Sequence, residues 1–364
     1  MRRAIIPAIA LLAVTSCTEI PTQPASPLFN QTAGNTIYVA PPTGDPTQDR
    51  QSLVDAFSLA QEGDLVELAA GTYVLGLRMW LCDREHEDCY PTRTYVPTAN
   101  NITIKGQAHG ADPTVIDGHS VIGLGKGIGV WLLSGVTIQE LTFDGFDLWA
   151  IEGLVAEDFT VSQVTVLGGD GWRTIVVRGH LEGVTISESV LTDSRQGMQV
   201  GTWGKVTITK NEISGTGDDY WQSEGIWVRG DNVTVTENVL DDHYIGIRLY
   251  LEPDAQVHIA ENVITGSYMG IMVYDPEPDA QVLIAENVIT DSRAVGMYLG
   301  TVTPPPPATL VVKENEIAGS EGAGLCIWPA PAPPFLLTLH ENEFHDNAGG
   351  DIVTTGWKDC LPSG

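Results

Sequence analysis

A repeat of about 25 residues in the second half of the chain constrains the fold more than any other feature. The segment PDAQVHIAENVIT, which begins at Pro253, returns almost unchanged as PDAQVLIAENVIT at Pro278. Self-similarity at a fixed period is typical of stacked arrays of one supersecondary unit. The same register continues in both directions and gives coils that start at Val136, Phe159, Val184, Val206, Val233, Val257, Val282, Leu310 and Leu337.

Within a coil, apolar and polar residues alternate in short runs that are separated by turn residues. The run from Val233 to Thr236 is followed by a turn and then by a second run from Gly246 to Tyr250. Period-two alternation of this length indicates strands and not helices. One coil has too few apolar residues to bury a face alone, so it must stack on its neighbours. The sequence therefore predicts an all-β solenoid.

An asparagine stands five residues after the start of six successive coils, and Ser189 holds the equivalent place one coil earlier. The six are Asn211, Asn238, Asn262, Asn287, Asn315 and Asn342. Because stacked strands lie about 4.8 Å apart, these amides can bond to one another in a column. A buried amide without partners would cost about 1–3 kcal/mol, so the column would fix the register of the coils.

This asparagine column and the repeated Gly-Ile-x-Val strand resemble the right-handed parallel β-helix proteins of the pectin-lyase-like fold. The resemblance covers roughly residues 36–350 and includes the N-terminal sequence GDLVELAAGTY. It implies a single right-handed parallel β-helix with a short N-terminal capping helix. The architecture is shared by lyases, hydrolases, epimerases and proteins without enzymatic activity, so it implies no one function.

The capping helix has its own start signals. Asp45 is an N-cap residue, Pro46 follows at the first helical position and Gln48 stands at the third. Leu53 and Phe57 then fall on one face with Ala60, and we expect that face to cover the open end of the solenoid. We assign residues 36–364 to the solenoid, with an insertion at about 78–96 and a C-terminal tail at about 351–364. The proline-rich pieces further on are loops at one edge of the coils.

Residues 1–16 have two arginines, an apolar run and small residues at the end, which predicts a secretory signal peptide. The ending Val-Thr-Ser before Cys17 resembles a bacterial lipobox, which implies lipidation at Cys17. Thr18 then favours the outer membrane or cell surface of a bacterium as the location. The alternative is an ordinary signal peptide with a chance cysteine. Residues 17–35 are expected to form a flexible tether.

The other four cysteines predict two disulfides, because an exported protein meets oxidising conditions. Cys82–Cys89 would close a short loop, and Cys326–Cys360 would hold the C-terminal tail against a late coil. Zinc is the alternative, but the chain has no CxxC pair to favour it.

The formal charge of −29 argues against nucleic acid as a partner, because such binding relies on Lys and Arg that neutralise phosphates. It also disfavours long polyanions unless arginines or a bound cation intervene. We expect a monomer that is anchored to the membrane through its lipid.

Two outward columns on the second run of each coil combine aromatic and arginine side chains. Aromatic rings stack on sugar rings, and the arginine fork binds carboxylates. The columns predict a polysaccharide groove, although aromatic residues also favour strands for structural reasons. The candidate binding residues are Arg178, Trp227, Arg229, Tyr250, Tyr274, Tyr298 and Trp328.

Acidic residues gather in the turns that enter this run, and the candidate catalytic residues are Asp218, Asp219, Asp242, His243 and Arg248. Paired carboxylates support acid–base hydrolysis or calcium binding, with Asp193, Asp218, Asp219 and Asp242 as candidate ligands for Ca²⁺. The Gly-Asp-Asp sequence resembles polygalacturonase-type hydrolases, but their Gly-His-Gly and Arg-Ile-Lys partners are missing. A lyase would need an arginine base such as Arg229 or Arg248. The alternative is that Asp serves the turns, since Asp-Ser-Arg recurs at 193–195 and 291–293.

A further acidic column precedes the asparagines: Glu237, Glu261, Glu286, Glu314 and Glu341. Neighbouring charges at this spacing repel by about 0.9 kcal/mol in water-like dielectric. Either the side chains spread into solvent or a divalent ion relieves the repulsion.

Taken together, the sequence predicts an exported, lipid-anchored β-helix protein that recognises polysaccharide on its aromatic and arginine face, with cleavage by a lyase or hydrolase mechanism as a further hypothesis. The competing interpretation is a non-catalytic surface scaffold or adhesion protein. No phosphate loop, HExxH or Gly-x-Ser-x-Gly sequence is present, so nothing indicates a nucleotide cofactor or a serine triad.

Overall fold

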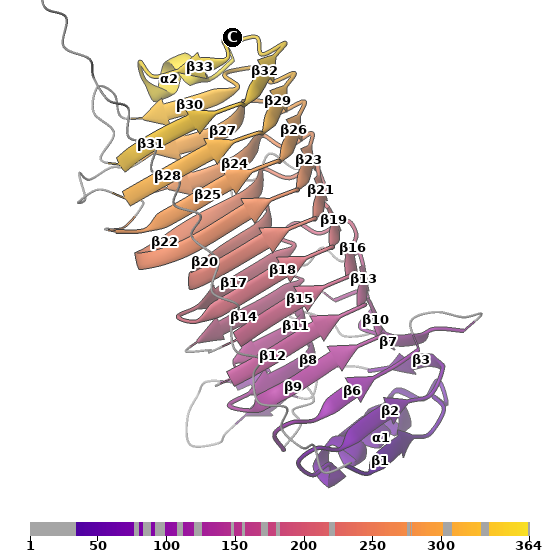
Figure 1. Cartoon of the computed structure of the whole chain (residues 1–364). Coiled ribbons are helices and arrows are strands. Elements are labelled where there is room, and N and C mark those ends of the chain that lie inside the picture. Colours follow the sequence, from indigo (N-terminus) through magenta and orange to yellow (C-terminus); the bar gives the residue numbers. More distant parts are fainter. Residues whose placement is uncertain are drawn as a thin grey trace, which may run out of the picture. The chain divides into compact units, whose positions relative to one another are not determined.

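A computed structural model describes residues 34–75, 99–107, 112–119, 126–146, 149–154, 157–168, 174–179, 183–217, 223–274, 277, 279–300, 308–328 and 335–362, and the backbone alone of 80–82 and 89–91. The predicted signal peptide, Cys17 and nearly all of the predicted tether lie outside these residues. The described chain winds into a right-handed parallel β-helix, as predicted (Figure 1). No helix among the described residues is long and apolar enough to cross a membrane.

Each complete coil contributes three strands, which stack into three faces (Figure 1). The first face consists of β1 (Thr36–Val39), β2 (Leu65–Leu68), β6 (Thr103–Lys105), β9 (Ser134–Gln139), β12 (Glu157–Ser162), β15 (Gly183–Ser187), β18 (Lys205–Thr209), β25 (Gln281–Ala285), β28 (Ala308–Lys313) and β31 (Phe335–His340). It also includes the second halves of the long strands β20 (Glu224–Thr236) and β22 (Ile245–Ala260).

The second face is a sheet of short strands that directly follow the asparagine position. Its members are β3 (Gly71–Val74), β7 (Thr114–Asp117), β10 (Thr142–Asp144), β13 (Thr165–Leu167), β16 (Val190–Leu191), β19 (Glu212–Ser214), β21 (Val239–Asp241), β23 (Val263–Thr265), β26 (Val288–Thr290), β29 (Glu316–Ala318) and β32 (Glu343–His345). Two runs per coil were predicted from the sequence, and this short third strand is the difference. Each of its strands has only two or three residues in the later coils, too few to show alternation.

The third face carries the predicted aromatic and arginine columns. It consists of β8 (Lys126–Trp131), β11 (Trp149–Leu154), β14 (Ile175–Gly179), β17 (Met198–Thr202), the first halves of β20 and β22, β24 (Met269–Tyr274), β27 (Val295–Gly300), β30 (Leu325–Trp328) and β33 (Ile352–Val353). Because β20 and β22 each run from the third face into the first without a break, the two faces form one continuous sheet.

The interior is a single column of apolar side chains. In one coil Val233 and Val235 point inward, and the residues paired with them in the next coil, Val257 and Ile259, are buried as well. Identical register repeats from coil to coil, so the buried cluster runs from Val39 to Ile327. Apolar burial of this kind, at about 25 cal/mol per Å², is the main driving force for stacking.

The asparagine ladder is confirmed. Asn262 Nδ2 donates to Asn287 Oδ1 at 2.9 Å and to the carbonyls of Val235 and Ala260. Its own Oδ1 accepts from the backbone N and the Nδ2 of Asn238. The same pattern holds from Asn211 through Asn342, and Ser189 ends it as predicted.

Helix α1 (Pro46–Leu59) begins as predicted, since the Asp45 side chain accepts from the backbone N of Thr47 and Gln48. It lies against the first coil (Figure 1) and buries Leu53 and Phe57. Its buried Asp49 carboxylate accepts bonds from the Thr43 and Val74 backbones, which ties the helix to β3.

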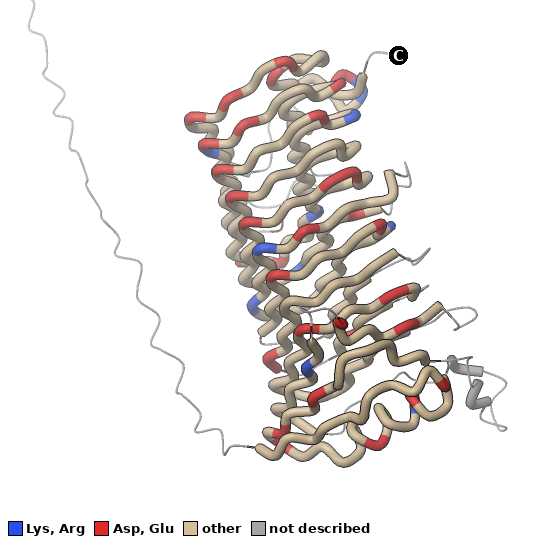
Figure 2. The backbone as a smooth tube through the Cα atoms, turned by 90° about the vertical axis from the view of Figure 1, so that its right-hand side faces the viewer, with Lys and Arg blue, Asp and Glu red and all other residues tan. Residues whose placement is uncertain are grey.

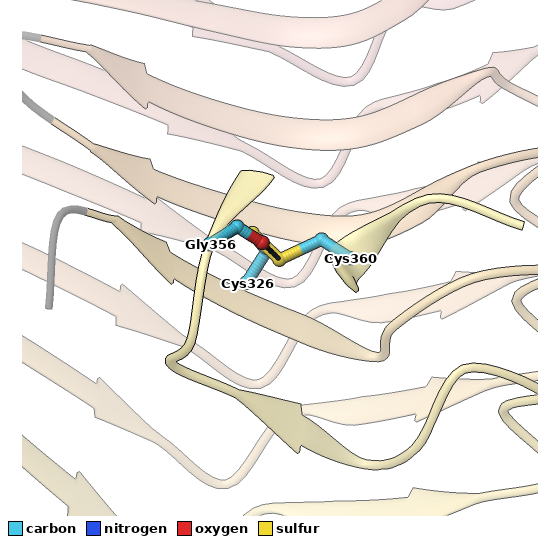
Figure 3. The surroundings of a disulfide bond; sticks show 3 residues. All are labelled: Cys326, Gly356 and Cys360. Atoms are coloured by element: carbon cyan, nitrogen blue, oxygen red, sulfur yellow. Dashed lines mark hydrogen bonds between the residues drawn. A yellow bond between two sulfur atoms is a disulfide. The ribbon is translucent and has the colours of Figure 1, made fainter. Parts of the chain in front are cut away.

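The insertion forms an antiparallel pair, β4 (Trp80–Cys82) and β5 (Cys89–Pro91), in which Cys82 lies opposite Cys89. The side chains of these two strands are outside the described residues, so the bond between them stays a prediction. The second predicted disulfide, Cys326–Cys360, is confirmed (Figure 3). It joins β30 to the short helix α2 (Trp357–Cys360) and so holds the C-terminal tail on the third face.

We expect Asn262→Ala to lower the free energy of unfolding by about 1–3 kcal/mol, because it leaves the Val235 and Ala260 carbonyls and the Asn238 N–H short of partners inside the protein. Urea denaturation followed by circular dichroism measures the change. Asn232→Ala removes an exposed asparagine and serves as the matched control. Equal stability of the two variants would contradict a stabilising ladder.

We expect Cys360→Ser to lower the free energy of unfolding by about 2–4 kcal/mol, since it removes a cross-link between residues that are 34 apart in the sequence. Thermal unfolding with and without a reductant measures the loss. The reductant should lower the melting temperature of the wild type more than that of the variant, and an equal effect on both would show that the cross-link contributes nothing.

Candidate functional site

The two outward columns on the third face have the predicted registers. Trp227 pairs with Arg248, and Arg229 pairs with Tyr250, which in turn pairs with Tyr274. The rings of Trp227 and Tyr250 lie 5.2 Å apart at a tilt of 42°. Glycine at position 201 leaves room for the Trp227 ring, because a Cβ there would lie 3.1 Å from it, closer than usual.

A buried carboxylate underlies the centre of this face. Glu224 is only 3% exposed, and its two oxygens accept from Arg248 Nη1 at 2.7 Å and from Gln196 Nε2 at 2.7 Å. Arg248 also donates to the Tyr250 hydroxyl, and its guanidinium lies 4.8 Å from the centre of the Tyr250 ring. The glutamate therefore holds the arginine, and the arginine holds the tyrosine that contacts Trp227.

A second pair stands beside it. Arg229 bonds to the buried Glu252 and places its guanidinium 5.5 Å from the centre of the Trp203 ring. Trp203 is 50% exposed and extends the aromatic surface, yet the sequence analysis did not select it. Trp203 follows the end of β17 and so belongs to neither column. It stands four residues after Gln199, an outward residue of β17, and this even spacing could have predicted that Trp203 faces outward as well.

Arg178 lies on β14, which pairs with β17, and it has a similar arrangement. Its Nη2 donates to Gln199 Oε1 at 2.7 Å, and the buried Glu152 acts on its charge. Burial lowers the pKa of Arg178, and Glu152 opposes that shift. At Arg229 the net shift is upward, because the hydrogen bond from the guanidinium to the Glu252 carboxylate raises its pKa. A catalytic base must release its proton, so this pairing works against Arg229 as a lyase base.

The third face is closed at its C-terminal end. Tyr298, predicted to bind substrate, is only 5% exposed because Trp357 of α2 packs edge-on against it at 5.1 Å. Its hydroxyl lies over Gly300, and Met269 and Val295 join it in an apolar cluster under the tail. Tyr298 is thus a packing residue here and does not belong to the open surface. Trp328 borders the same cluster and is half-buried.

The predicted catalytic cluster does not assemble among the described residues. Asp218 and Asp219 lie outside them. Asp242 occupies a turn with φ of 60°, and its carboxylate faces Arg293 at 3.7 Å. In other coils the same turn position is held by Asp193 with φ of 51°, by further aspartates or by glycine. Aspartate tolerates this left-handed conformation, so turn geometry accounts for these acids.

Arg293 is a residue whose role the sequence analysis missed. Its guanidinium donates to the carbonyls of Gly266, His243 and Gly217, which belong to three different coils. The side chain thus joins the turns at which catalysis was predicted. The recurrence of Asp-Ser-Arg pointed to this structural role.

His243 was predicted to act with Asp242, and the structure places its side chain in the interior, away from the exposed Asp242 carboxylate. Its ring is fully buried against the backbone of Gly215 and Gly225, where side chains would clash with it. Among the described residues neither ring nitrogen has a hydrogen-bond partner of good geometry. Burial lowers the pKa of His243 to about 4, and the Ile213 backbone offsets this only in part. The following coils have buried serines at this position: Ser267, Ser292 and Ser320.

The described residues contain no group of three or more His, Cys, Asp or Glu side chains placed to hold a metal ion. The predicted calcium ligands Asp193 and Asp242 therefore belong to no such group among the described residues. Acidic residues follow one edge of the coils (Figure 2). The column from Glu237 to Glu341 consists of five glutamates, all of which are exposed. Each has a positive φ, so the column marks a recurrent left-handed turn.

Comparison with known proteins agrees with the fold. A family model described as "Right handed beta helix region" matches residues 173–344. The mannuronan C-5 epimerase AlgE4 A-module of Azotobacter vinelandii is 17% identical, with 85% of this chain and 94% of that chain covered and a TM-score of 0.50. The surface adhesin PfbA of Streptococcus pneumoniae is 18% identical, with coverage of 83% and 89% and a TM-score of 0.52. No curated protein matches the chain.

These likenesses agree with the right-handed parallel β-solenoid of the structure. At such low identity they show the fold alone. One neighbour is an epimerase and the other an adhesin, so the function of this chain must be argued from its own surface.

We expect the stability of the wild type to decline as the pH falls from about 6.5 to about 4, because the unfolded chain gains a proton at His243 that the folded chain excludes. The full contribution, up to about 3 kcal/mol, is present above pH 6.5. His243→Asn should remove this component, with exposed His258→Asn as the control. Denaturation midpoints measured across this pH range compare the three proteins. A slope that persists in His243→Asn would exclude this histidine as its cause.

Proposed function

We propose that this protein binds polysaccharide on the third face, over strands β14, β17, β20, β22 and β24. The observation that carries the proposal is the Trp227–Tyr250 pair, held in place by a buried Gln196–Glu224–Arg248 network. The network is more elaborate than strand stability requires, because an exposed aromatic pair on a sheet needs no buried charge beneath it.

The geometry suits an extended sugar chain. Successive coils repeat every 4.8 Å or so, which is similar to the length of one residue in an extended polysaccharide. Trp203, Trp227, Tyr250 and Tyr274 lie on consecutive coils and present partly exposed rings. Rings fixed in this way lose little conformational entropy when a ligand stacks on them.

Binding without bond cleavage accounts for the described residues better than catalysis does. Asp242 is a turn residue, His243 is buried, and Arg248 is paired with Glu224. An active site would require these groups within reach of one another and of a substrate. Export and anchoring of the chain to an outer membrane through Cys17 complete the proposal, and would place the face at the cell surface.

Trp227→Ala and Tyr250→Ala should each weaken polysaccharide binding about tenfold, which corresponds to about 1.4 kcal/mol of lost stacking. Affinity electrophoresis in gels that contain a panel of neutral and acidic polysaccharides measures the loss. Tyr38→Ala is the matched control, because Tyr38 is 75% exposed and lies on the first face. If the gels retard both face variants as strongly as the wild type, the competing interpretation is favoured, in which the protein is a non-catalytic scaffold that binds through a different surface. Release of reducing ends or of unsaturated uronates in the same mixtures would instead show that the protein cleaves polysaccharide.

A further inference from the structure

The arginines of the third face are already neutralised by the protein. Over strand residues 149–154, 175–179, 198–202, 224–231, 245–252 and 269–274 the only basic residues are Arg178, Arg229 and Arg248, while the acids are Glu152, Glu224, Asp231 and Glu252. Among these described strands, negative charges therefore outnumber positive ones.

The pairing is built into the fold at two of the three arginines. Glu224 and Glu252 are buried, and each bonds directly to its arginine on a neighbouring coil. A buried carboxylate that lost its arginine would be left without its ion-pair partner, which is unfavourable. A ligand carboxylate that drew Arg248 or Arg229 away from its glutamate would have to break this buried pair, and one that bound the remaining N–H groups would meet a guanidinium whose charge is already offset. The paired arginines can still offer their remaining N–H groups to hydroxyl oxygens.

From this arrangement we propose that the polysaccharide bound on the third face is a neutral glycan, recognised by ring stacking and by hydrogen bonds from charge-compensated arginines. The inference rests on the proposed binding function and gives it a substrate class. A polyuronate would meet the surplus of negative charge on the face and the formal −29 of the whole chain. Uncharged sugar rings meet only the aromatic surface of Trp203, Trp227, Tyr250 and Tyr274.

Titration of the full-length chain with neutral gluco- and xylo-oligosaccharides, oligogalacturonate, oligoalginate and chitosan oligomers tests this proposal. We expect a neutral oligosaccharide to bind most tightly, with a Kd that changes less than twofold between about 0.05 and 0.5 M NaCl, because salt screens charges and not stacking. Tighter binding of either uronate, weakened by salt, would overturn the proposal. So would a preference for the cationic chitosan oligomers.

The variant Glu252→Gln tests the neutralisation itself, since it releases the charge of Arg229 with little change of shape. We expect it to gain at least tenfold in affinity for oligogalacturonate, so that the ratio of its uronate affinity to its neutral-glycan affinity rises above that of the wild type. Glu237→Gln changes the net charge equally at an exposed turn and is the control. If folded Glu252→Gln protein, checked by circular dichroism, gains no uronate affinity, the proposed neutralisation is wrong.

Different results would reject the binding function and the neutral ligand. If the wild type binds no glycan in the panel, both the proposed function and its substrate class are rejected. Retained binding that depends on Trp227 but favours uronates would keep the proposed function and reject only the neutral ligand.

Discussion

Backbone pairing between coils in strict register is the constraint on which the whole molecule depends. A parallel strand satisfies its polar groups only if the neighbouring coil presents the same length of chain at the same height. The asparagine ladder enforces that condition at one corner of the solenoid, because each amide bonds to both its own coil and the next. Once that corner is aligned, every side-chain column on the three faces is aligned with it.

Much of this architecture could be predicted from the sequence because it repeats. The period, the asparagine positions, the register of Trp227 with Arg248 and the capping helix all follow from local patterns that recur or that carry known start signals. The short strands of the second face were not predicted, because two or three residues cannot show a period. The Cys326–Cys360 bond was predicted because the cysteines are few and the predicted export implied an oxidising compartment.

The candidate site was harder to predict, since it depends on where side chains point. Glu224 and Glu252 carry no sequence signal that sets them apart from other acids, and only the folded chain shows them buried and bonded to arginines of neighbouring coils. His243 stands beside Asp242 in the sequence, yet the turn sends one inward and the other to solvent. Tyr298 is covered by Trp357, nearly sixty residues later in the chain, which no column pattern could reveal.

The tail that is cross-linked at Cys360 gives the third face a polarity that a plain solenoid lacks. A stack of similar coils has no preferred stopping point, so a linear polymer could slide along it in either direction. Here α2 packs on an apolar cluster of β24, β27 and β30, while Trp227 and Tyr250 on earlier coils stay partly exposed. In the proposed binding mode, a bound chain would have to abut a fixed barrier with one terminus or leave the surface there, and the protein would set the number of sugar units in contact.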